Sequence, residues 1–292
     1  MAPAAIIQDH VLPTQIPESD ETQAQGPSIP DLFSLKNQTI IVTGGGRGLG
    51  ITLAQAVVEA GGHAVCLDIL PSPSPKEWAD LQVSAKKNNV TISYDVCNIT
   101  SEEEVSQKFQ RIAETAPAPF SGLIACAGIQ QRTPCWDYPA EDFNRMMNVN
   151  VTGTFITAKY ATRSFMERGI KGSIVLIASM SGQIANRGLT CSAYNSSKAA
   201  VHQLCRSMAQ EIGPQHGIRI NTLSPGYIRT AMTDALLEQE PELERKWMDA
   251  ALLGRLGAPE DFKAPAVFLL GKGAAWMTGT DLRVDGGNCA AA

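Results

Sequence analysis

Clustered histidines and long apolar runs are both missing from this 292-residue chain. Its four histidines, at positions 10, 63, 202 and 216, lie far apart and show no metal-ligand spacing. No run approaches the roughly 18 apolar residues that a membrane helix needs. The sequence therefore predicts neither a metal site nor a membrane-spanning segment.

An excess of positive charge is missing as well. The 24 lysines and arginines are outnumbered by 29 aspartates and glutamates, which leaves a net charge of −5. No basic cluster occurs, so nucleic acid is not an expected partner. No lysine or arginine precedes Lys36, which argues against a secretory signal and an Arg-rich transit peptide. We expect a cytoplasmic protein.

Cysteine pairing is also not indicated. The seven cysteines are scattered, lack Cys-x-x-Cys spacing and often lie in apolar runs such as "AVCLD", so we expect reduced core residues. The terminal "CAAA" formally matches a prenylation signal at Cys289. Because no polybasic stretch lies beside it, we do not expect the modification.

The first 34 residues differ from the rest in composition. They contain prolines that break any helix, and they predict a disordered or loosely draped tail, with a subunit-contact arm as the alternative. No linker or repeat follows, so residues 35–292 are expected to form one domain. Residues 228–254, split by Pro241, predict a small substrate lobe of two short helices.

Short apolar runs alternate with longer amphipathic segments after residue 36. The expected strands are 38–44, 63–68, 90–95, 122–128, 172–179, 218–224 and 281–286, and expected helices include 48–60, 101–114, 140–169 and 192–213. Most strands are apolar on both faces, as buried parallel strands are. This alternation predicts an α/β fold, a doubly wound parallel Rossmann sheet of about seven strands with helices on both faces. Ligands of such sheets bind at the carboxyl ends of the strands.

A glycine-rich turn, "TGGGRGLG" (43–50), joins the first expected strand to the first long helix. Glycines allow positive φ and let backbone N–H groups approach an anion, and the helix N-terminus adds partial positive charge. The spacing Gly44-x-x-x-Gly48-x-Gly50 differs from the generic Gly-x-Gly-x-x-Gly. The turn predicts a pyrophosphate site.

Asp68 ends the second expected strand, 18 residues after Gly50. An acid at about this separation accepts from the ribose 2′-hydroxyl and repels a 2′-phosphate, so it favours NAD. Arg47 in the glycine turn could instead serve a 2′-phosphate. We expect NAD, with NADP as the alternative.

Tyr194 and Lys198 lie one helical turn apart in "SAYNSSKAA" (192–200). Taken alone, such a pair is typical of a solvated helix face. Its context is different, because it is one of eight motifs that follow one another along the chain. In order they are "TGGGRGLG", Asp68, "YDV" (94–96), "AG" (127–128), "NVTG" (150–153), "SMSG" (179–182), "YNSSK" (194–198) and "PGYIRT" (225–230). In these motifs, over about residues 36–288, the chain resembles the short-chain dehydrogenase/reductase family. Within it, the fungal sugar-alcohol dehydrogenases look most similar.

The resemblance implies a set of site residues. The catalytic group would be Ser181 (13 residues before the tyrosine), Tyr194, Lys198 and Asn150. The cofactor contacts would be Thr43, Gly44, Arg47, Gly48, Leu49, Gly50, Asp68, Asp95, Val96, Ala127, Gly128, Tyr194, Lys198, Pro225, Gly226, Ile228 and Thr230. A homotetramer or homodimer, built partly from the helices 140–169 and 192–213, is also implied.

These residues suggest how an alcohol would be oxidised. A free tyrosine has a pKa near 10, and a neighbouring ammonium should lower it, so Tyr194 would act as acid and base with Lys198 beside it. Ser181 would bind the substrate oxygen, and Asn150 would hold a water that connects Lys198 to solvent. We expect a secondary alcohol and its ketone to be interconverted.

The substrate is less defined. A polyol and its ketose, as for D-arabinitol 2-dehydrogenases, is the leading expectation, with Gln183, Asn186 and Arg187 as contacts or else an ordinary polar loop. A ketoreductase with a larger apolar substrate is the alternative. A dinucleotide sensor or a non-redox enzyme on the same scaffold is a third, which the catalytic residues argue against.

Two features are unusual. Where the family has Asn-Asn-Ala-Gly, this chain has Ala125-Cys126-Ala127-Gly128, so we expect altered packing there. Pro265 falls within "PEDFKAPAVFLL", and a helix over that stretch should kink unless it begins late.

Overall fold

One parallel sheet organises the computed structural model, which describes residues 26–229, 233, 237–238 and 240–291. Within that part of the chain the strand order is β3-β2-β1-β4-β5-β6-β7, and neighbouring strands all pair parallel. The strands are β1 (Thr39–Thr43), β2 (His63–Asp68), β3 (Ile92–Val96), β4 (Phe120–Ala125), β5 (Ser173–Ile177), β6 (Arg219–Pro225) and β7 (Asp281–Val284). The predicted sheet is confirmed.

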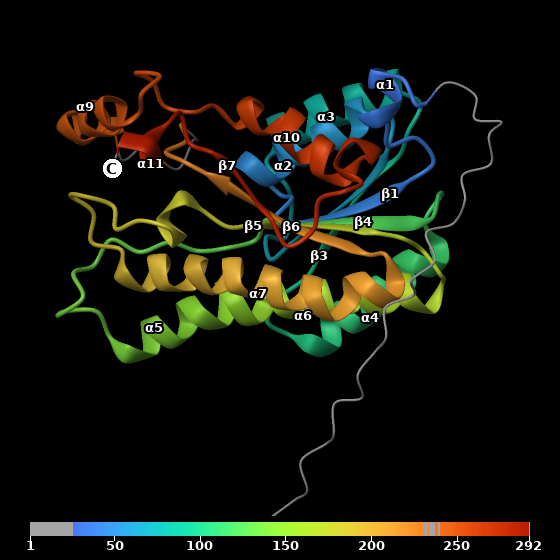
Figure 1. The fold of residues 1–292 in the computed structure, drawn as a ribbon, viewed down its shortest axis with the longest axis horizontal. Coiled ribbons are helices and arrows are strands. Elements are labelled where there is room, and N and C mark those ends of the chain that lie inside the picture. The colour runs from blue at the N-terminus through green and yellow to red at the C-terminus, as the bar shows by residue number, and fades with distance from the viewer. Residues whose placement is uncertain (1–25, 230–232, 234–236, 239, 292) are drawn as a thin grey trace, which may run out of the picture.

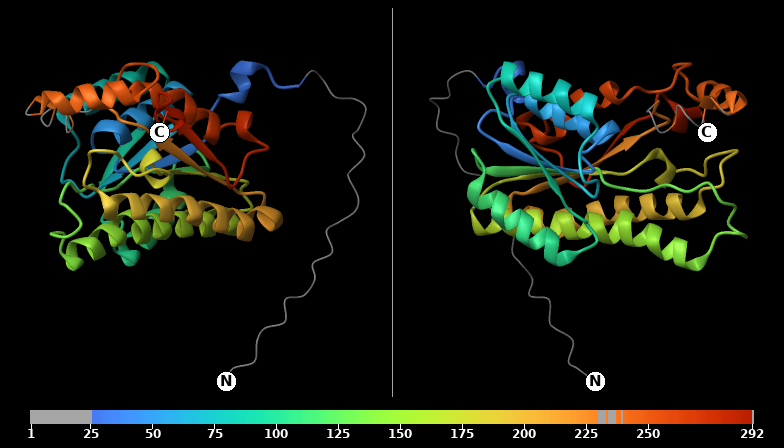
Figure 2. Two further views of the ribbon diagram at one scale, coloured as in Figure 1. Left: turned by 60° about the vertical axis from the view of Figure 1, so that its left-hand side comes forward. Right: turned by 180° about the vertical axis from the view of Figure 1, so that it is seen from behind.

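Helices cover both faces of the sheet (Figure 1). They are α1 (Ile29–Leu32), α2 (Gly48–Glu59), α3 (Pro75–Lys87), α4 (Glu102–Thr115), α5 (Ala140–Met147), α6 (Thr154–Glu167), α7 (Ser192–His216), α9 (Pro241–Ala250), α10 (Lys263–Leu270) and α11 (Asn288–Ala291). Short turns of other helix types are η1 (Asn148–Gly153), η2 (Met180–Gly182), η3 (Pro259–Phe262) and η4 (Lys272–Ala274). In both views of Figure 2 the sheet lies between two layers of helices.

Two apolar cores form because successive strand residues point to opposite faces. Ile41 of β1 packs into the core beneath α4, α6 and α7, while Ile40 and Val42 pack into the core beneath α2, α3 and α10. In the first core, the rings of Phe109 and Phe120 lie 5.8 Å apart edge to face. Continuous apolar strands are therefore buried on both sides.

The helix expected over residues 140–169 is interrupted. α5 passes through η1, a π-helical segment, before α6 begins at Thr154. Inside it the Asn150 carbonyl accepts a hydrogen bond of 2.8 Å from the hydroxyl of Thr154. π-Segments are wider than an α-helix and occur often at functional sites.

The helix that contains Pro265 begins late, which is the case in which no kink was expected. The η3 turn precedes α10, which starts at Lys263, so Pro265 falls in the first turn. In the first turn of a helix the backbone N–H groups have no partner within the helix. Proline, which lacks this N–H, therefore costs no helical hydrogen bond there.

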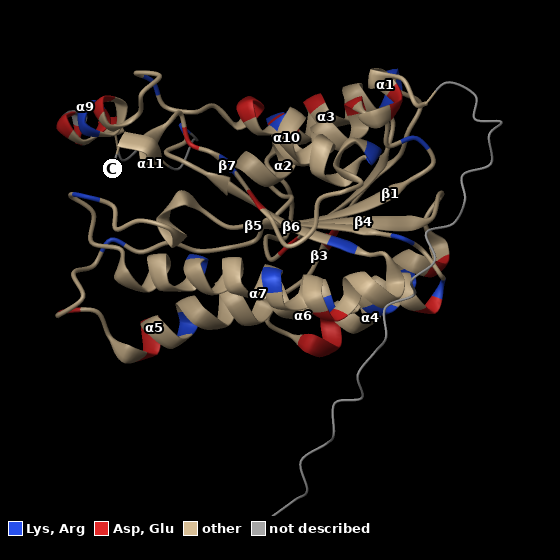
Figure 3. Cartoon of the chain, viewed as in Figure 1, with Lys and Arg blue, Asp and Glu red and all other residues tan. Residues whose placement is uncertain are grey.

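The N-terminal tail is only partly described, since residues 1–25 lie outside the described ranges. In the described part, Ser28 caps α1, and Phe33 packs its ring 6.0 Å from that of Phe268. Lysines, arginines, aspartates and glutamates are interspersed over both helical layers in Figure 3. Among the described helices, none has both the length and the apolar character needed to cross a bilayer.

Candidate active site

The predicted site residues meet at the carboxyl edge of the sheet. Thr43 and Asp68 are the last residues of β1 and β2, and Pro225 is the last residue of β6. Ala127 and Gly128 follow β4, and the Ser179–Ser181 stretch follows β5. Strands far apart in the sequence therefore bring these groups to one place.

The glycine turn has the geometry that the sequence predicts. Gly44 has φ +66° and Gly48 has φ +58°, and a Cβ on Gly50 would lie 2.0 Å from the Gly44 carbonyl oxygen. Arg47 is exposed at the start of α2, and Leu49 packs partly into the core beneath that helix. The turn thus closes tightly around the N-terminus of α2, where an anion is stabilised.

Asp68 supports the turn directly. Its carboxylate accepts hydrogen bonds from the backbone N–H groups of Gly46, at 2.9 Å, and Leu70, at 3.1 Å. A second carboxylate was not foreseen: Glu77 of α3 accepts a bond of 3.1 Å from the N–H of Gly48. Two acids therefore border the expected pyrophosphate and ribose region.

The end of β3 provides two different surfaces. Asp95 is engaged by α4, where Lys108 lies 2.5 Å from its carboxylate and Arg111 pairs with the other oxygen. Val96 is 45% exposed, which is unusual for a valine at a strand end. Apolar surface is thus available here for a flat ring.

The loop after β4 is held by a hydrogen bond to β1. Buried Thr43 accepts a bond of 3.4 Å from the N–H of Ala127 through its hydroxyl. A Cβ on Gly128 would lie 3.2 Å from the Asn150 side-chain oxygen and 3.7 Å from Lys198 Nζ. Gly128 therefore lets this loop approach two of the predicted catalytic residues.

Asn150 is fully buried and binds backbone. Its amide accepts from the Ile129 N–H at 2.8 Å and donates to the Ile129 carbonyl at 2.9 Å and to the Ser197 hydroxyl at 3.0 Å. The side chain therefore clamps the loop after β4 to η1 and α7.

Tyr194 and Lys198 lie on one face of α7, as predicted from their spacing. The Lys198 ammonium is 5.7 Å from the centre of the Tyr194 ring and donates a 2.8 Å bond to the Ile177 carbonyl. Burial lowers the pKa of Lys198 to about 8. One of its hydrogens has a partner here, so the others can serve ribose hydroxyls.

The Tyr194 phenol differs from expectation. Burial raises its pKa to about 12, while a hydrogen bond with the Ser179 hydroxyl acts in the opposite direction. Lys198 is not among the groups that shift this pKa here, so the lowering expected from its ammonium stays a prediction.

Ser179, which was not predicted from the sequence, is the serine whose hydroxyl lowers the pKa of the Tyr194 phenol. Ser181, the predicted serine, lies two residues further on, is also buried, and donates its backbone N–H to the Ser179 hydroxyl at 3.1 Å. Counting 13 residues back from Tyr194 spans a whole loop, whose length can differ between proteins. The position of Ser179 just after strand β5 is a signal that does not depend on this length.

Two of the three predicted substrate contacts have hydrogen-bond partners within the chain. Gln183 is exposed and bonded to Asp281 and Arg283 of β7. Asn186 is buried and donates to the Tyr227 hydroxyl at 3.2 Å, and Arg187 is exposed. None of the three lines the cavity described next.

A cavity of about 260 Å³ lies between the loop after β4, the loop before α7 and α9. Its described lining is Gln130, Gln131, Arg132, Leu189, Cys191, Thr233 and Trp247. Gln131 accepts from the Tyr194 N–H at 3.2 Å, which ties this cavity to the start of α7. The cavity therefore adjoins the first turn of α7, which carries Tyr194.

Much of the polar lining is already engaged. The Gln131 amide also donates to the Thr133 carbonyl, and the Arg132 guanidinium makes two 3.1 Å bonds to Glu240. Trp247 stacks on Tyr227, and its buried indole N–H has no partner in the described part of the chain. The cavity walls therefore offer a ligand fewer free hydrogen-bonding groups than their glutamine and arginine side chains would suggest.

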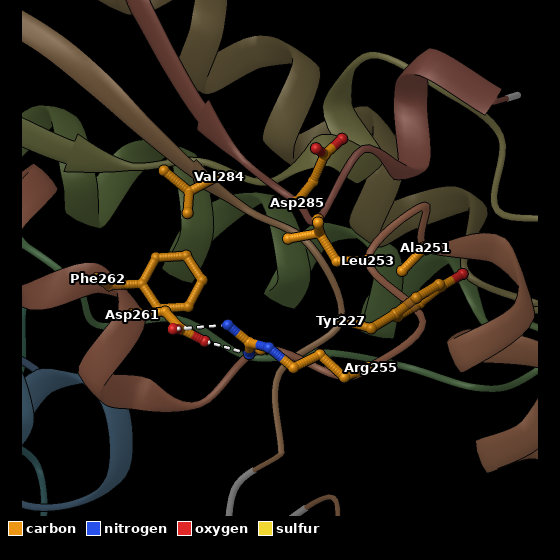
Figure 4. Close-up of a pocket in the computed structure, with 10 residues that line it drawn as sticks. Tyr227, Ala251, Leu253, Arg255, Asp261, Phe262, Val284 and Asp285 are labelled. Atoms are coloured by element: carbon orange, nitrogen blue, oxygen red, sulfur yellow. Dashed lines mark hydrogen bonds and ion pairs between the residues drawn. The ribbon is translucent and has the colours of Figure 1, made fainter.

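A second pocket, of about 170 Å³, lies on the other side of Tyr227 (Figure 4). An ion pair between Arg255 and Asp261 lines it, Phe262 lies beside the pair, and Val284 lies beyond Phe262. It contains none of the predicted catalytic or cofactor residues, so we do not assign the reaction to it.

The nicotinamide end is partly described. Gly226 packs against Asp285, where a Cβ would lie 2.6 Å from its Cα, and Ile228 pairs with Gly257. Thr230 lies outside the described residues. The glycine turn, Asp68 and the buried ammonium together provide the donors and acceptors that a dinucleotide requires, so the residues present fit such a cofactor.

Comparisons with known proteins agree with this geometry. A family model described as Enoyl-(Acyl carrier protein) reductase matches residues 44–288. A short-chain dehydrogenase/reductase, notP′ of Aspergillus versicolor, is 45% identical over 265 residues, 90% of each chain. D-arabinitol 2-dehydrogenase (ribulose-forming) of Candida tropicalis is 33% identical, over 87% of this chain and 93% of its own. The solved NADPH-dependent 3-quinuclidinone reductase of Rhodotorula rubra superposes with a TM-score of 0.82 at 32% identity, over 94% of this chain and 99% of its own.

Proposed function

This chain belongs to the short-chain dehydrogenase/reductase family of oxidoreductases that act on CH–OH groups, and we propose that it interconverts a secondary alcohol and a ketone through Ser179, Tyr194 and Lys198. The observation that carries the proposal is the meeting of three groups: the buried Lys198 ammonium lies 5.7 Å from the centre of the Tyr194 ring, and the Ser179 hydroxyl lowers the pKa of the Tyr194 phenol. A nicotinamide dinucleotide, when bound, supplies or accepts the hydride.

The residues of this chain handle the proton and the oxygen. In the reducing direction the Tyr194 hydroxyl donates its proton to the ketone oxygen, and the Ser179 hydroxyl donates a hydrogen bond to the same oxygen. Lys198 holds the ribose hydroxyls and places positive charge beside the phenol. In the oxidising direction Tyr194 must lose its proton, and the raised pKa of about 12 is opposed by Ser179 and by the positive charge of the oxidised cofactor.

The cofactor we propose is NAD. The carboxylates of Asp68 and Glu77 border the ribose and pyrophosphate region and would repel a 2′-phosphate. Arg47 is the one feature of the turn that favours NADP, and the Rhodotorula reductase is named as NADPH-dependent. The remaining proposed cofactor contacts are the glycine turn, Leu49, Asp95, Val96, Ala127, Gly128, Pro225, Gly226, Ile228 and Thr230.

Two substrate classes have support. Relatives named as galactitol and D-arabinitol 2-dehydrogenases, at 32–35% identity, favour a polyol and its ketose. The cavity favours a ketone with an apolar body, because the amide of Gln131 and the guanidinium of Arg132 are already bonded. A hydroxyl buried there without a partner costs about 1–3 kcal/mol.

A substrate panel separates the two classes. Purified protein is given NADH or NADPH with ketoses and apolar cyclic ketones, and NAD or NADP with pentitols and hexitols, and absorbance of the reduced nicotinamide is followed. Turnover of any of them that is lost in Tyr194→Phe supports the redox proposal. No turnover with any substrate, or an activity that Tyr194→Phe leaves intact, would overturn it. A homo-oligomer and a cytoplasmic location stay predictions.

A further inference from the structure

Asp281, the first residue of β7, lies at the centre of a polar network outside the site described above. One carboxylate oxygen accepts from the hydroxyls of Thr222 at 2.7 Å and Ser224 at 2.5 Å, both on β6. The other accepts from the side-chain amide of Gln183 at 2.5 Å. A single carboxylate therefore connects β6 and β7 to the loop that follows β5.

Gln183 is fixed at both ends of its amide. Its nitrogen donates to Asp281, and its oxygen accepts from Arg283 at 2.8 Å. Residues 281 and 283 lie on the same side of β7, because side chains alternate along a strand. Gln183 also ends the η2 turn, which begins with Ser179 as its N-cap. The loop that carries Ser179 is therefore anchored to β7 at its far end.

The same loop rests on α7. A Cβ on Gly182 would lie 2.7 Å from the Lys198 carbonyl carbon, so the loop backbone lies directly on the helix. One turn beyond Lys198, buried His202 is 2.8 Å from the Ser224 hydroxyl and 3.5 Å from the Asp281 carboxylate. The network thus joins the serine loop, the edge strand and the helix that carries Tyr194.

We propose that Asp281 is a positioning residue, which acts through Gln183 to hold the Ser179 hydroxyl against the Tyr194 phenol. This inference rests on the proposed function, in which those two groups bind the substrate oxygen. The bonds to Asp281 are charge-assisted, roughly twice as strong as neutral ones, and they hold the end of the η2 turn that Ser179 begins. A misplacement of about 1 Å at a reacting group can cost about 10²-fold in rate.

The test pairs a disruptive variant with one that restores the contact. Asp281→Asn removes the negative charge and leaves one side-chain oxygen for three donors that now share two, so we expect kcat for ketone reduction to fall about 10- to 100-fold. The dissociation constant of NADH, followed by its fluorescence, should stay within about twofold, because the network does not touch the cofactor region. In Gln183→Glu combined with Asp281→Asn, the new carboxylate can accept from the amide at 281 and pair with Arg283. We expect at least about a tenfold recovery of kcat relative to the single variant.

Two further measurements make the outcome decisive. Asp261→Asn is the matched control, since it removes another ion-paired aspartate, remote from the serine loop, and should leave kcat unchanged. Hydrogen exchange of the Gly182 and Gln183 amides, which bond to Ser179 and Met180, should speed up in Asp281→Asn and slow again in the double variant. If Asp281→Asn does not fold, Gln183→Ala at its exposed position removes the same anchor and should give the same loss of kcat and of protection.

Unchanged kcat and exchange in Asp281→Asn, or a double variant no better than the single one, would overturn the inference. An equal loss in Asp261→Asn would also overturn it, because the effect would then be general destabilisation. If the wild-type protein turns over no substrate, the proposed function fails, while the exchange experiment still decides whether Asp281 holds the loop.

Discussion

Glu77 of α3 accepts a hydrogen bond of 3.1 Å from the backbone N–H of Gly48, at the N-terminus of α2. This places a carboxylate where the phosphates of the proposed cofactor would lie. Glu77→Gln keeps an oxygen that can accept the same bond and removes only the charge.

We expect Glu77→Gln to bind NADH about three- to tenfold more tightly, because a charge pair near the surface contributes about 1 kcal/mol. NADPH, with its extra phosphate, should gain more. Fluorescence titration at low and high salt measures both, and the gain should shrink with salt. Glu114→Gln on α4, which removes an equal charge at an exposed site, is the control. Equal affinities in wild type and Glu77→Gln would contradict the role of this carboxylate.

Ser179 and Ser181 give a second prediction, which separates two neighbouring hydroxyls. Ser179→Ala removes the hydroxyl that lowers the pKa of the Tyr194 phenol, and we expect kcat to fall about 10²- to 10³-fold, as when an oxyanion donor is lost. Ser181→Ala keeps the backbone N–H that binds residue 179, so its kcat should change little. Steady-state kinetics of both variants suffice. The reverse order would return the role to Ser181.

Asn150 gives a prediction about stability. Asn150→Ala leaves both backbone groups of Ile129 without their partner, at a cost of about 1–3 kcal/mol for each buried group. We expect a lower midpoint in urea together with lower activity. Asn88→Ala, whose amide bonds only to a helix-end carbonyl, should lose less. Lost activity at wild-type stability would show that Asn150 acts on the reaction alone, as in the water-relay expectation.

Lys198 gives a prediction about pH. Burial lowers its pKa from 10.5 to about 8, so the folded state disfavours the ammonium. Between about pH 8 and 10.5 the unfolded chain binds more protons at this residue than the folded chain, and its contribution to stability rises with pH. Below about pH 8 the destabilisation is fully present.

We therefore expect Lys198→Met to be more stable than wild type at pH 7, by up to about 3 kcal/mol, and to lose this advantage by about pH 10.5. The difference between the two unfolding curves at each pH cancels other groups that titrate there, such as the cysteines. A difference that does not change between pH 7 and 10.5 would contradict the lowered pKa.

Local patterns in the sequence predicted most of the fold. Runs such as "QTIIVTG" are apolar on both faces, and the structure confirms the parallel sheet that this implies. The glycine turn and the Tyr194–Lys198 spacing were also recognisable, because each depends on residues within about two helical turns of one another. These features need no knowledge of distant contacts.

What the sequence did not reveal depends on contacts across the chain. Gln183 was expected at the substrate, but its partners, Asp281 and Arg283, are about a hundred residues away. Glu77 meets Gly48 only because α3 packs beside α2. Ser179 was missed because the serine was located by counting 13 residues back from Tyr194. Such a count points to the wrong residue when the intervening loop differs in length from the family's.

The π-segment η1 has a consequence for how this protein can change. It accommodates more residues per turn than an α-helix, and it carries the buried amide that clamps the loop after β4. Point substitutions change side chains but leave the number of residues between α5 and α6 the same. Removing the wide turn therefore requires a deletion, which would also rotate α5 against α6. A single substitution can therefore replace Ser179 or Glu77, but it cannot remove this π-helical turn.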